Sequence, residues 1–536
     1  MLNKGEHMNT AEVISRRTWL KGAGVVAAAT VVAACSSDDT TPGGSDPTGS
    51  ESRPLPIPPV LKPATSGTTK VFRLEAKPGT SEIVAGKSTP TWGYNGSILG
   101  PTIRVRRGDD IRVKVGNALP EMTTVHWHGM HLPANMDGGP HQPIMPGDTW
   151  TAEYTIKQQA ATLWYHPHPH GTTSRHAYRG LSGLLIVDDD QSDQLDLPNR
   201  YGIDDIPLIV QEKRFTSDHM LDETDREDVG LIGDTAVVNG ISGPTFTATT
   251  RRVRFRILDG STMRLFNLAF SDRRDFTIIG SDGGLLDRPV TATSVYLSPG
   301  ERAEIVVDLE PEEKVTLKAV RFADNLEVDD DDSPDFGLKD EFDLLSIVGP
   351  PAEAAVPPVL PTGLNPTLRA PARPAATAKK RTFDMEWFQI NNRLMDITRV
   401  DDTVDVDTDE IWTIANKDNW IHNFHVHDTQ FRVLSLDKTS TTPLIDGWKD
   451  TILLAPGAVA TIALRFTDYT SNRWPYMYHC HLMFHEDQGM MGQFVVVKPG
   501  QKPSPAIGSG LEHDMGPKPS NSRSAPETSS SHRHSG

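Results

Sequence analysis

Histidines gather in four short clusters whose spacing suits the binding of several metal ions at one place. Ten of the 19 histidines lie in these clusters. The clusters are His126-Trp127-His128, His166-Pro167-His168, His422-Asn423-Phe424-His425-Val426-His427, and His479-Cys480-His481 with His485. On a strand, residues i and i+2 face the same side about 6.6 Å apart, so each His-x-His pair can present two imidazoles to one site. Four pairs supply eight imidazoles, enough for about three metal ions with room for a bound oxygen species.

A single thiol lies between the two histidines of the last pair. Because side chains alternate along a strand, Cys480 points to the opposite face and toward a different metal ion. His422 precedes its pair by an odd number of residues and can turn to that face, while His485 and Met490 follow along the same loop. Two imidazoles, a thiolate and a weak thioether form a blue-copper site. The peptide bonds of Cys480 would connect this site to the imidazole cluster.

The elements that must position these side chains repeat three times. A Pro-Gly turn leads into an alternating strand at Pro146-Gly147, Pro299-Gly300 and Pro456-Gly457, at intervals of about 155 residues. This interval suits one small β-sandwich per copy. The first and third copies have a His-x-His pair before the turn and a second histidine cluster after it, and the middle copy has neither. We therefore expect the chemistry in domains one and three, with domain two as a spacer or a substrate wall.

Simpler explanations of the clusters fit this repeat less well. A lone His-x-His pair on a strand is commonly an accident of the surface. A zinc site needs only four ligands and has no use for eight paired imidazoles. Clusters at equivalent places in two copies of one repeat favour a shared function.

We predict an all-β chain of three tandem Greek-key β-sandwich domains, because no long helical periodicity is present. The domains are expected at residues 67–190, 200–350 and 380–500. A linker rich in Pro and Ala, at 351–379, joins the last two. The tail at 501–536 is rich in Ser, Pro, Gly and His and is predicted to be disordered.

The N-terminal segment predicts export. Arg16-Arg17 followed by an Ala/Val run up to residue 34 is typical of a twin-arginine signal, which makes that export machinery a partner. The run is too short to span a bilayer stably. Val32-Ala33-Ala34-Cys35 is similar to a lipoprotein cleavage site, so Cys35 is a candidate lipid anchor and residues 35–66 a flexible tether. Ordinary cleavage beside an incidental cysteine is the alternative. We expect a periplasmic or cell-envelope location.

Net charge argues against nucleic-acid binding, and the positions of the cysteines argue against a disulfide. The net charge of −18 argues against nucleic acid, whose phosphates need Lys and Arg for neutralisation. The two cysteines, Cys35 and Cys480, are both committed elsewhere, so a disulfide between them is not expected. We expect a monomer.

The four histidine motifs resemble the copper signatures of the multicopper oxidases, and in particular those of three-domain bacterial laccases and copper-efflux oxidases. The resemblance spans residues 67–498. It implies three cupredoxin-like domains with a trinuclear copper cluster between the first and the third. It also implies four copper ions: one type 1, one type 2 and two type 3.

The resemblance further implies a role for each matching residue. The type 1 ligands are matched by His422, Cys480 and His485, with Met490 as the axial ligand. The type 2 ligands are matched by His126 and His425. The ligands of the type 3 pair are matched by His128, His166, His168, His427, His479 and His481.

Three acids are candidates for roles beside the metals. Reduction of dioxygen consumes protons, so acidic groups are expected near the cluster. Asp137 and Glu486 match acids that the family places there. Asp418 lies four residues before His422 and is placed to accept a hydrogen bond from that imidazole, where electrons are expected to enter. The alternative for all three is a solvated loop carboxylate.

The implied function is that of a laccase-like oxidase. It would take single electrons from phenolic or similar reductants at the type 1 copper and reduce dioxygen to water at the cluster. A cuprous or manganese ion oxidase in metal tolerance is the alternative, which the lack of a Met-rich insert in domain three weakens. A copper nitrite reductase would have two such domains and no cluster. A copper-free scaffold or cell-division relative would not need to retain every ligand type.

Overall fold

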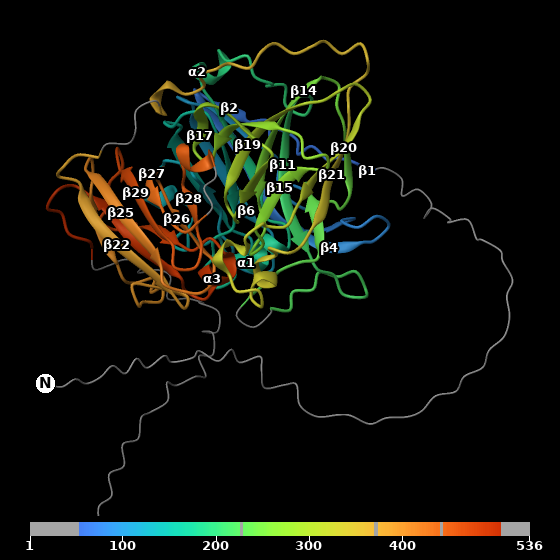
Figure 1. Cartoon of the computed structure of the whole chain (residues 1–536). Coiled ribbons are helices and arrows are strands. Elements are labelled where there is room, and N and C mark those ends of the chain that lie inside the picture. Colours follow the sequence, from blue (N-terminus) through green and yellow to red (C-terminus); the bar gives the residue numbers. More distant parts are fainter. Residues whose placement is uncertain (1–52, 226–228, 369–373, 440–442, 505–536) are drawn as a thin grey trace, which may run out of the picture. The chain divides into compact units, whose positions relative to one another are not determined.

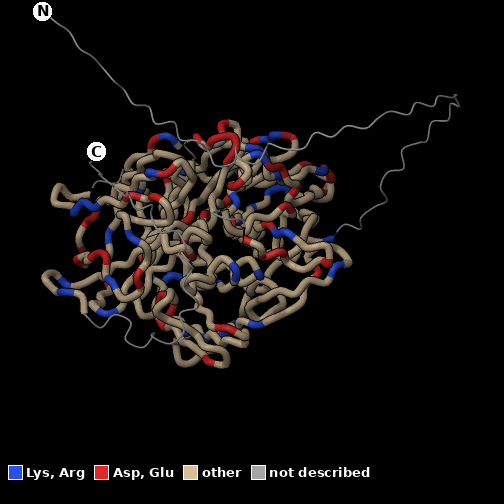
Figure 2. The backbone as a smooth tube through the Cα atoms, turned by 90° about the horizontal axis from the view of Figure 1, so that it is seen from below, with Lys and Arg blue, Asp and Glu red and all other residues tan. Residues whose placement is uncertain are grey.

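The computed structural model describes residues 53–225, 229–368, 374–439 and 443–504 (Figure 1). The predicted export signal, Cys35 and the predicted tail beyond residue 504 lie outside these residues. Among the described residues, no helix combines the length and the apolar character needed to cross a membrane. Figure 2 shows Asp and Glu interspersed with Lys and Arg along the described chain.

The first two β-sheets carry the first two histidine clusters. One has the order β2-β3-β6-β8 with β4 paired to β3, and the other the order β5-β10-β9-β7. The strands are β2 (Ala64–Ser66), β3 (Thr69–Ser81), β4 (Thr89–Tyr94), β5 (Ile103–Arg106), β6 (Asp110–Asn117), β7 (His126–His128), β8 (Thr149–Thr155), β9 (Ala161–His166) and β10 (Gly183–Asp188). Both sheets pack on one core that includes Phe72, Trp127 and Leu185. Because Trp127 points into this core, alternation turns its two neighbouring histidines away from it.

The middle pair of sheets forms the second domain. The sheet orders are β1-β13-β21-β20-β15-β18 and β12-β11-β14-β19-β16-β17. The strands are β1 (Arg53–Pro54), β11 (Asp205–Lys213), β12 (Thr235–Val238), β13 (Pro244–Thr247), β14 (Arg252–Asp259), β15 (Phe266–Phe270), β16 (Phe276–Ser281), β17 (Gly284–Ala292), β18 (Ser294–Leu297), β19 (Arg302–Asp308), β20 (Lys314–Ala319) and β21 (Phe342–Val348). Phe255, Ile305 and Leu345 contribute to its core.

The last pair of sheets, shown in orange to red in Figure 1, carries the other two histidine clusters. Their orders are β23-β22-β25-β29-β27 and β24-β31-β30-β26-β28. The strands are β22 (Lys379–Glu386), β23 (Gln389–Ile390), β24 (Asp402–Asp405), β25 (Asp409–Asn416), β26 (His422–Val426), β27 (Arg432–Leu436), β28 (Thr451–Leu454), β29 (Val459–Arg465), β30 (Tyr476–His479) and β31 (Met491–Val497). The core includes Trp412 and Phe424, and Met263 and Leu338 from the second domain also join it.

The three sandwiches share one topology, which confirms the repeat and the all-β class. Each Pro-Gly turn leads into the predicted strand, and these strands are β8, β19 and β29. In each domain this strand pairs antiparallel with a neighbour, β6, β14 or β25, which itself pairs parallel with β3, β11 or β22. The domain boundaries given above stay predictions.

Helices are few and short among the described residues. They are α1 (Thr173–Tyr178), α2 (Asp190–Asp193), α3 (Met483–Asp487) and the 3-10 turns Ala134–Met136, Asn325–Glu327, Ser333–Phe336, Pro366–Leu368 and Pro443–Asp446. The backbone N–H groups of Thr173 and Ser174 at the start of α1 donate to the Asp487 carboxylate at the end of α3, at 2.9 and 2.8 Å. This contact joins domain one to domain three just beyond the last histidine cluster.

Residues 53–66, the last part of the predicted flexible tether, are ordered in the structure. Of residues 35–66, the described part begins at residue 53 and is held against the domains. β1 pairs parallel with β13 of the second domain, and β2 pairs antiparallel with β3 of the first. Leu55, only 8% exposed, packs into the second core. Strand pairing satisfies the backbone groups and burial of Leu55 adds apolar contact, so residues 53–66 are ordered rather than flexible.

An ion pair between domains one and three should make stability depend on pH. His131 Nδ1 lies 2.8 Å from Asp428 Oδ1, and its Nε2 lies 3.1 Å from Asp468 Oδ2. Burial lowers the pKa of His131, but the two carboxylates outweigh it and raise the pKa to about 9. The folded pKa thus exceeds the unfolded one, so the contribution is complete below about pH 6.5 and is lost as the pH rises through about 9. It amounts to about 3 kcal/mol.

His131→Gln should therefore flatten the fall in unfolding free energy between pH 7 and 9. Chemical denaturation at several pH values measures this slope. His219→Gln is the control, because no ion pair of His219 is found among the described residues. An unchanged slope in His131→Gln would contradict the assignment.

Candidate metal centre

The thiol and two imidazoles meet in the interior of domain three. Cys480 Sγ lies 3.7 Å from His422 Nδ1 and 3.6 Å from His485 Nδ1, and the two nitrogens are 3.0 Å apart. All three side chains are at most 1% exposed. His422 opens β26, Cys480 directly follows β30, and α3 presents His485. Met490 is also buried, and its carbonyl oxygen accepts a hydrogen bond from the Cys480 N–H at 3.0 Å.

Asn423 orders this region and was missed as a functional residue in the sequence. Its side-chain oxygen accepts the His481 backbone N–H at 2.6 Å and lies 3.6 Å from Cys480 Sγ. Its side-chain nitrogen donates to the Pro299 carbonyl oxygen at 2.9 Å. The sequence shows Asn423 only as the residue after His422. Its hydrogen bonds to the residue after the thiol and to the Pro299 turn of domain two become visible only in the fold.

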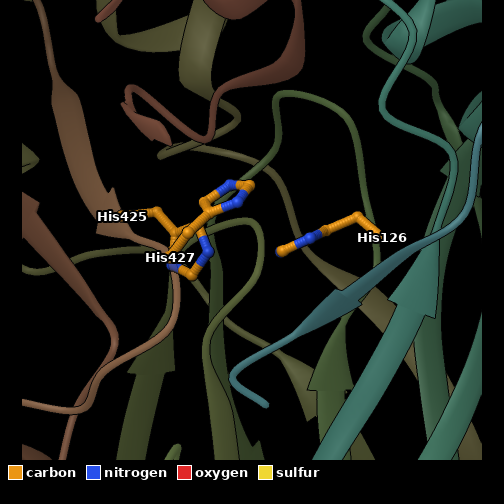
Figure 3. Close-up of side chains that lie close together, drawn as sticks. All are labelled: His126, His425 and His427. Atoms are coloured by element: carbon orange, nitrogen blue, oxygen red, sulfur yellow. The ribbon is translucent and has the colours of Figure 1, made fainter. Parts of the chain in front are cut away.

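The eight remaining imidazoles converge between domains one and three. Nε2 of His479 lies 3.2 Å from Nε2 of both His168 and His427. His166 Nε2 lies 3.4 Å from His128 Nδ1. Figure 3 shows His126 approaching from one side and His425 and His427 from the other. The ring of His126 stacks on His427 at 3.9 Å between centroids, and His128 stacks on His425 at 3.8 Å. The structure thus brings together every residue that the sequence assigned to the cluster.

The donor atoms fit metal ions. Burial, followed by neighbouring imidazoles, lowers the pKa of His128, His166, His168, His425, His427 and His481, and burial lowers that of His479 to about 3. These rings are therefore neutral at pH 7, the form that binds metal. Nε2 of His126, His425 and His481 is buried without a hydrogen-bond partner among the described residues. Buried unsatisfied nitrogens are costly, and metal coordination would satisfy them.

Two of the predicted acids contact the outer nitrogens of cluster imidazoles. Asp137 Oδ2 lies 2.7 Å from His427 Nδ1, and the Asp137 carbonyl oxygen lies 3.0 Å from His126 Nδ1. The two Glu486 carboxylate oxygens lie 3.2 and 3.3 Å from Nδ1 of His168 and His479. Asp137 and Glu486 are at most 1% exposed, so neither is a solvated loop carboxylate. Burial and Asp487 raise the pKa of Glu486.

The third predicted acid lies on the thiol side. Asp418 Oδ2 lies 3.4 Å from His422 Nε2 and accepts the Trp387 backbone N–H at 3.0 Å. Asp418 is 8% exposed, so it lies between the buried imidazole and the surface.

A further acid, Asp450, also contacts the cluster and has no motif in the sequence. Its Oδ1 lies 3.0 Å from His128 Nε2, and its carbonyl oxygen lies 2.8 Å from His425 Nδ1. It directly precedes β28, whose Thr451 pairs with His425 of β26. Its only signal in the sequence is its place directly before Thr451 and the apolar run Ile452-Leu453-Leu454.

Comparison with known proteins agrees with this arrangement. Models described as multicopper oxidase match residues 75–192, 210–325 and 364–500. A multicopper oxidase of Staphylococcus aureus is 37% identical over 450 residues, which is 83% of this chain and 92% of the relative. The chain belongs to the multicopper oxidase family. Membership confirms the resemblance inferred from the motifs and the cupredoxin-like fold of the three domains, and it implies that the chain binds copper.

Two more relatives of this multicopper oxidase bear on its activity. The crystal structure of a laccase from Pediococcus acidilactici superimposes with a TM-score of 0.75 at 34% identity, covering 84% of this chain and 95% of that one. The cell division protein FtsP of Xenorhabdus nematophila is 32% identical over 453 residues, 83% of this chain and 93% of that protein. The family therefore includes proteins named for an oxidase activity and others named for a cellular process.

Proposed function

We propose that this multicopper oxidase is a laccase-like enzyme that takes single electrons from aromatic reductants and reduces dioxygen to water. Four copper ions would serve it. His422, Cys480, His485 and axial Met490 would hold type 1 copper, and His126 and His425 type 2 copper. The type 3 pair would be held by His128, His166, His168, His427, His479 and His481. When bound, the copper ions accept electrons one at a time and supply the place where dioxygen is reduced.

The connection between the two groups of ligands supports this function more than any other feature. Cys480 belongs to the thiol site, while His479 and His481 on either side of it belong to the imidazole cluster. A few covalent bonds of one chain segment therefore join the site that receives electrons to the site that uses them. A protein that only stored copper would not need this arrangement.

The reaction consumes protons, and the buried acids are placed to supply them. Four reductant molecules of the phenol type each lose one electron and one proton, and dioxygen takes up four electrons and four protons to give two waters. Asp137 and Glu486 lie behind cluster imidazoles, where they can hold and pass protons toward the oxygen. Asp418 fixes the orientation of His422 on the side where electrons enter.

An aromatic hairpin at the thiol site favours aromatic reductants over metal ions. β22 and β23 are joined by Trp387 and Phe388 alone, both with positive φ (47° and 59°). Such a turn favours Asn-Gly, and each non-glycine residue there costs about 1–3 kcal/mol. Phe388 contacts His485 with 5.1 Å between ring centroids, and Trp387 contacts Trp420 at 5.7 Å. Trp387 is 61% exposed, so its ring can stack on a reductant close to the imidazoles.

Copper analysis, an optical spectrum and oxygen uptake on a panel of reductants test this proposal. We expect four copper ions per chain, a strong thiolate-to-copper band, and faster turnover of phenols than of Cu(I) or Mn(II). Faster turnover of a metal ion would favour the alternative of a metal oxidase. A colourless, inert protein after full copper loading would favour a scaffold role such as that suggested by the FtsP name.

Trp387→Ala should weaken the use of aromatic reductants. Loss of one stacking partner removes about 1 kcal/mol, so kcat/KM for a phenol should fall about fivefold, mainly through KM. Leu434→Ala, an exposed apolar residue elsewhere in domain three, is the control. Steady-state oxygen uptake measures both variants, and an equal effect of the two changes would contradict the role of the hairpin.

Export through the twin-arginine machinery, a periplasmic or envelope location, a lipid anchor at Cys35 and a monomeric state complete the proposal. They rest on the sequence alone, because residues 1–52 lie outside the described part of the chain.

A further inference from the structure

The second domain, which has no histidine cluster, places an arginine at the edge of the copper cluster. Arg302 is the first residue of β19 and is fully buried. It follows the turn Pro299-Gly300, the middle copy of the Pro-Gly repeat. Gly300 has φ +89°, and a Cβ on it would lie 3.0 Å from the His481 ring. The turn therefore packs directly against a cluster imidazole, at a positive φ and a close distance that favour glycine.

Arg302 uses all five of its N–H donors, and the acceptors come from all three domains. Nε donates to the Thr162 carbonyl oxygen of domain one at 3.0 Å. Nη1 and Nη2 donate to the carbonyl oxygens of Gly300 and Asp282 in domain two, both at 2.9 Å. The same two nitrogens donate to the Asp450 carboxylate of domain three, at 2.8 and 2.6 Å. A planar guanidinium can satisfy this geometry, and a lysine cannot.

Asp450 in turn sets the orientation of one cluster imidazole. Asp450 Oδ1 accepts from His128 Nε2 at 3.0 Å, so the proton of the neutral ring belongs on Nε2. The free lone pair is then on Nδ1, which faces His166 Nε2 at 3.4 Å inside the cluster. Without a fixed carboxylate, the ring could carry its proton on either nitrogen, and one of the two forms cannot bind metal through Nδ1.

We propose that Arg302 is a positioning residue of the copper cluster. Through Asp450, it holds His128 in the ring orientation and tautomer that present Nδ1 to the metal ions. The second domain is then part of the metal centre rather than the spacer or substrate wall expected from the sequence. This proposal rests on the proposed copper-dependent function.

A second buried ion pair fixes the same contact. Lys449 Nζ lies 2.8 Å from Asp282 Oδ2 and 2.6 Å from Glu301 Oε1, and both acids belong to domain two. Asp282 Oδ1 also accepts the Arg302 backbone N–H at 2.8 Å. Lys449, the neighbour of Asp450, and the Arg302 backbone both bind Asp282, which fixes the two chain segments that carry the contact between Arg302 and Asp450.

Arg302→Lys is the first test, because it keeps the positive charge and removes the two parallel hydrogen bonds from the guanidinium to the Asp450 carboxylate. The matched control is Arg256→Lys, another buried arginine of domain two that also reaches domain one, through Thr162 Oγ1 at 2.9 Å, but ends on Asp205 and Glu304. Copper per chain after dialysis against a graded chelator, the type 2 paramagnetic resonance signal, the thiolate-to-copper band and the thermal midpoint are measured for the wild type and both variants.

We expect Arg302→Lys to keep the thiolate-to-copper band and to lose cluster copper at a chelator concentration 10- to 100-fold lower than the wild type. Arg256→Lys should lose thermal stability but hold its copper as the wild type does. Equal copper retention in the two variants would overturn the proposal. If Arg302→Lys does not fold, Asp450→Ala, which removes the acceptor of the His128 Nε2 proton, decides in its place: retention of all copper by that variant overturns the proposal equally. A wild type that binds no copper would refute the proposed function instead, which is a different outcome.

Discussion

Replacing Cys480 by serine is expected to remove the thiolate-to-copper band and to reduce oxygen uptake to the uncatalysed background. The Cys480 thiol would bind the same copper ion as His422 and His485, whose Nδ1 atoms lie 3.7 and 3.6 Å from Sγ. The main chain of Cys480 also connects this site to the cluster. A serine hydroxyl is a hard ligand that does not replace the soft thiolate copper prefers. The eight cluster imidazoles are untouched, so copper should fall from four ions per chain to three.

Metal analysis and spectroscopy of the purified variant check this result. Met491→Leu is the control, because Met491 is buried on the same segment without belonging to the proposed ligands. It should keep the band, the copper and the turnover. A Cys480→Ser protein that remains coloured or turns over a phenol would show that the thiol is not a ligand of the site that receives the electrons.

Alternation along a strand predicted much of the metal centre. Alternation predicts that Cys480 points to one side and its two neighbours to the other. In the structure, Cys480 Sγ lies beside His422 and His485, and both neighbours lie in the cluster. The rule held beyond the formal strand. β30 ends at His479, yet the extended course of the chain continues far enough to keep the alternation at His481. Short His-x-His spacing is thus informative because it needs only local backbone geometry.

The partners that fix these ligands could not be predicted in this way. His128 and Asp450 are 322 residues apart in sequence, and Arg302 comes from a domain with no metal motif. Such contacts depend on how three sandwiches pack, and no local pattern encodes that packing. The prediction of a flexible tether at residues 53–66 was wrong for a related reason. Residues 53–66 have the Pro-rich composition of a linker, but pairing with β13 and β3 and burial of Leu55 in the second core hold them.

Charge removal at Asp137 should separate the binding of copper from the delivery of protons. In the wild type, Asp137 Oδ2 lies 2.7 Å from His427 Nδ1. In Asp137→Asn, the amide oxygen can still accept a hydrogen bond from this nitrogen, and the backbone carbonyl oxygen still contacts His126 Nδ1. Copper content should therefore remain at the wild-type level. The amide cannot carry a proton, so reoxidation of the reduced enzyme by dioxygen should slow by about 100-fold.

Stopped-flow mixing of reduced enzyme with dioxygen, followed through the thiolate-to-copper band, measures this step directly. Asp428→Asn is a matched control, because Asp428 is also a buried acid. It is next to His427 in sequence, but its carboxylate faces His131 instead of a cluster imidazole. Its reoxidation should proceed at the wild-type rate. If Asp137→Asn is reoxidised as fast as the wild type at every pH, Asp137 only orients His427, and the protons must come from Glu486 or from solvent.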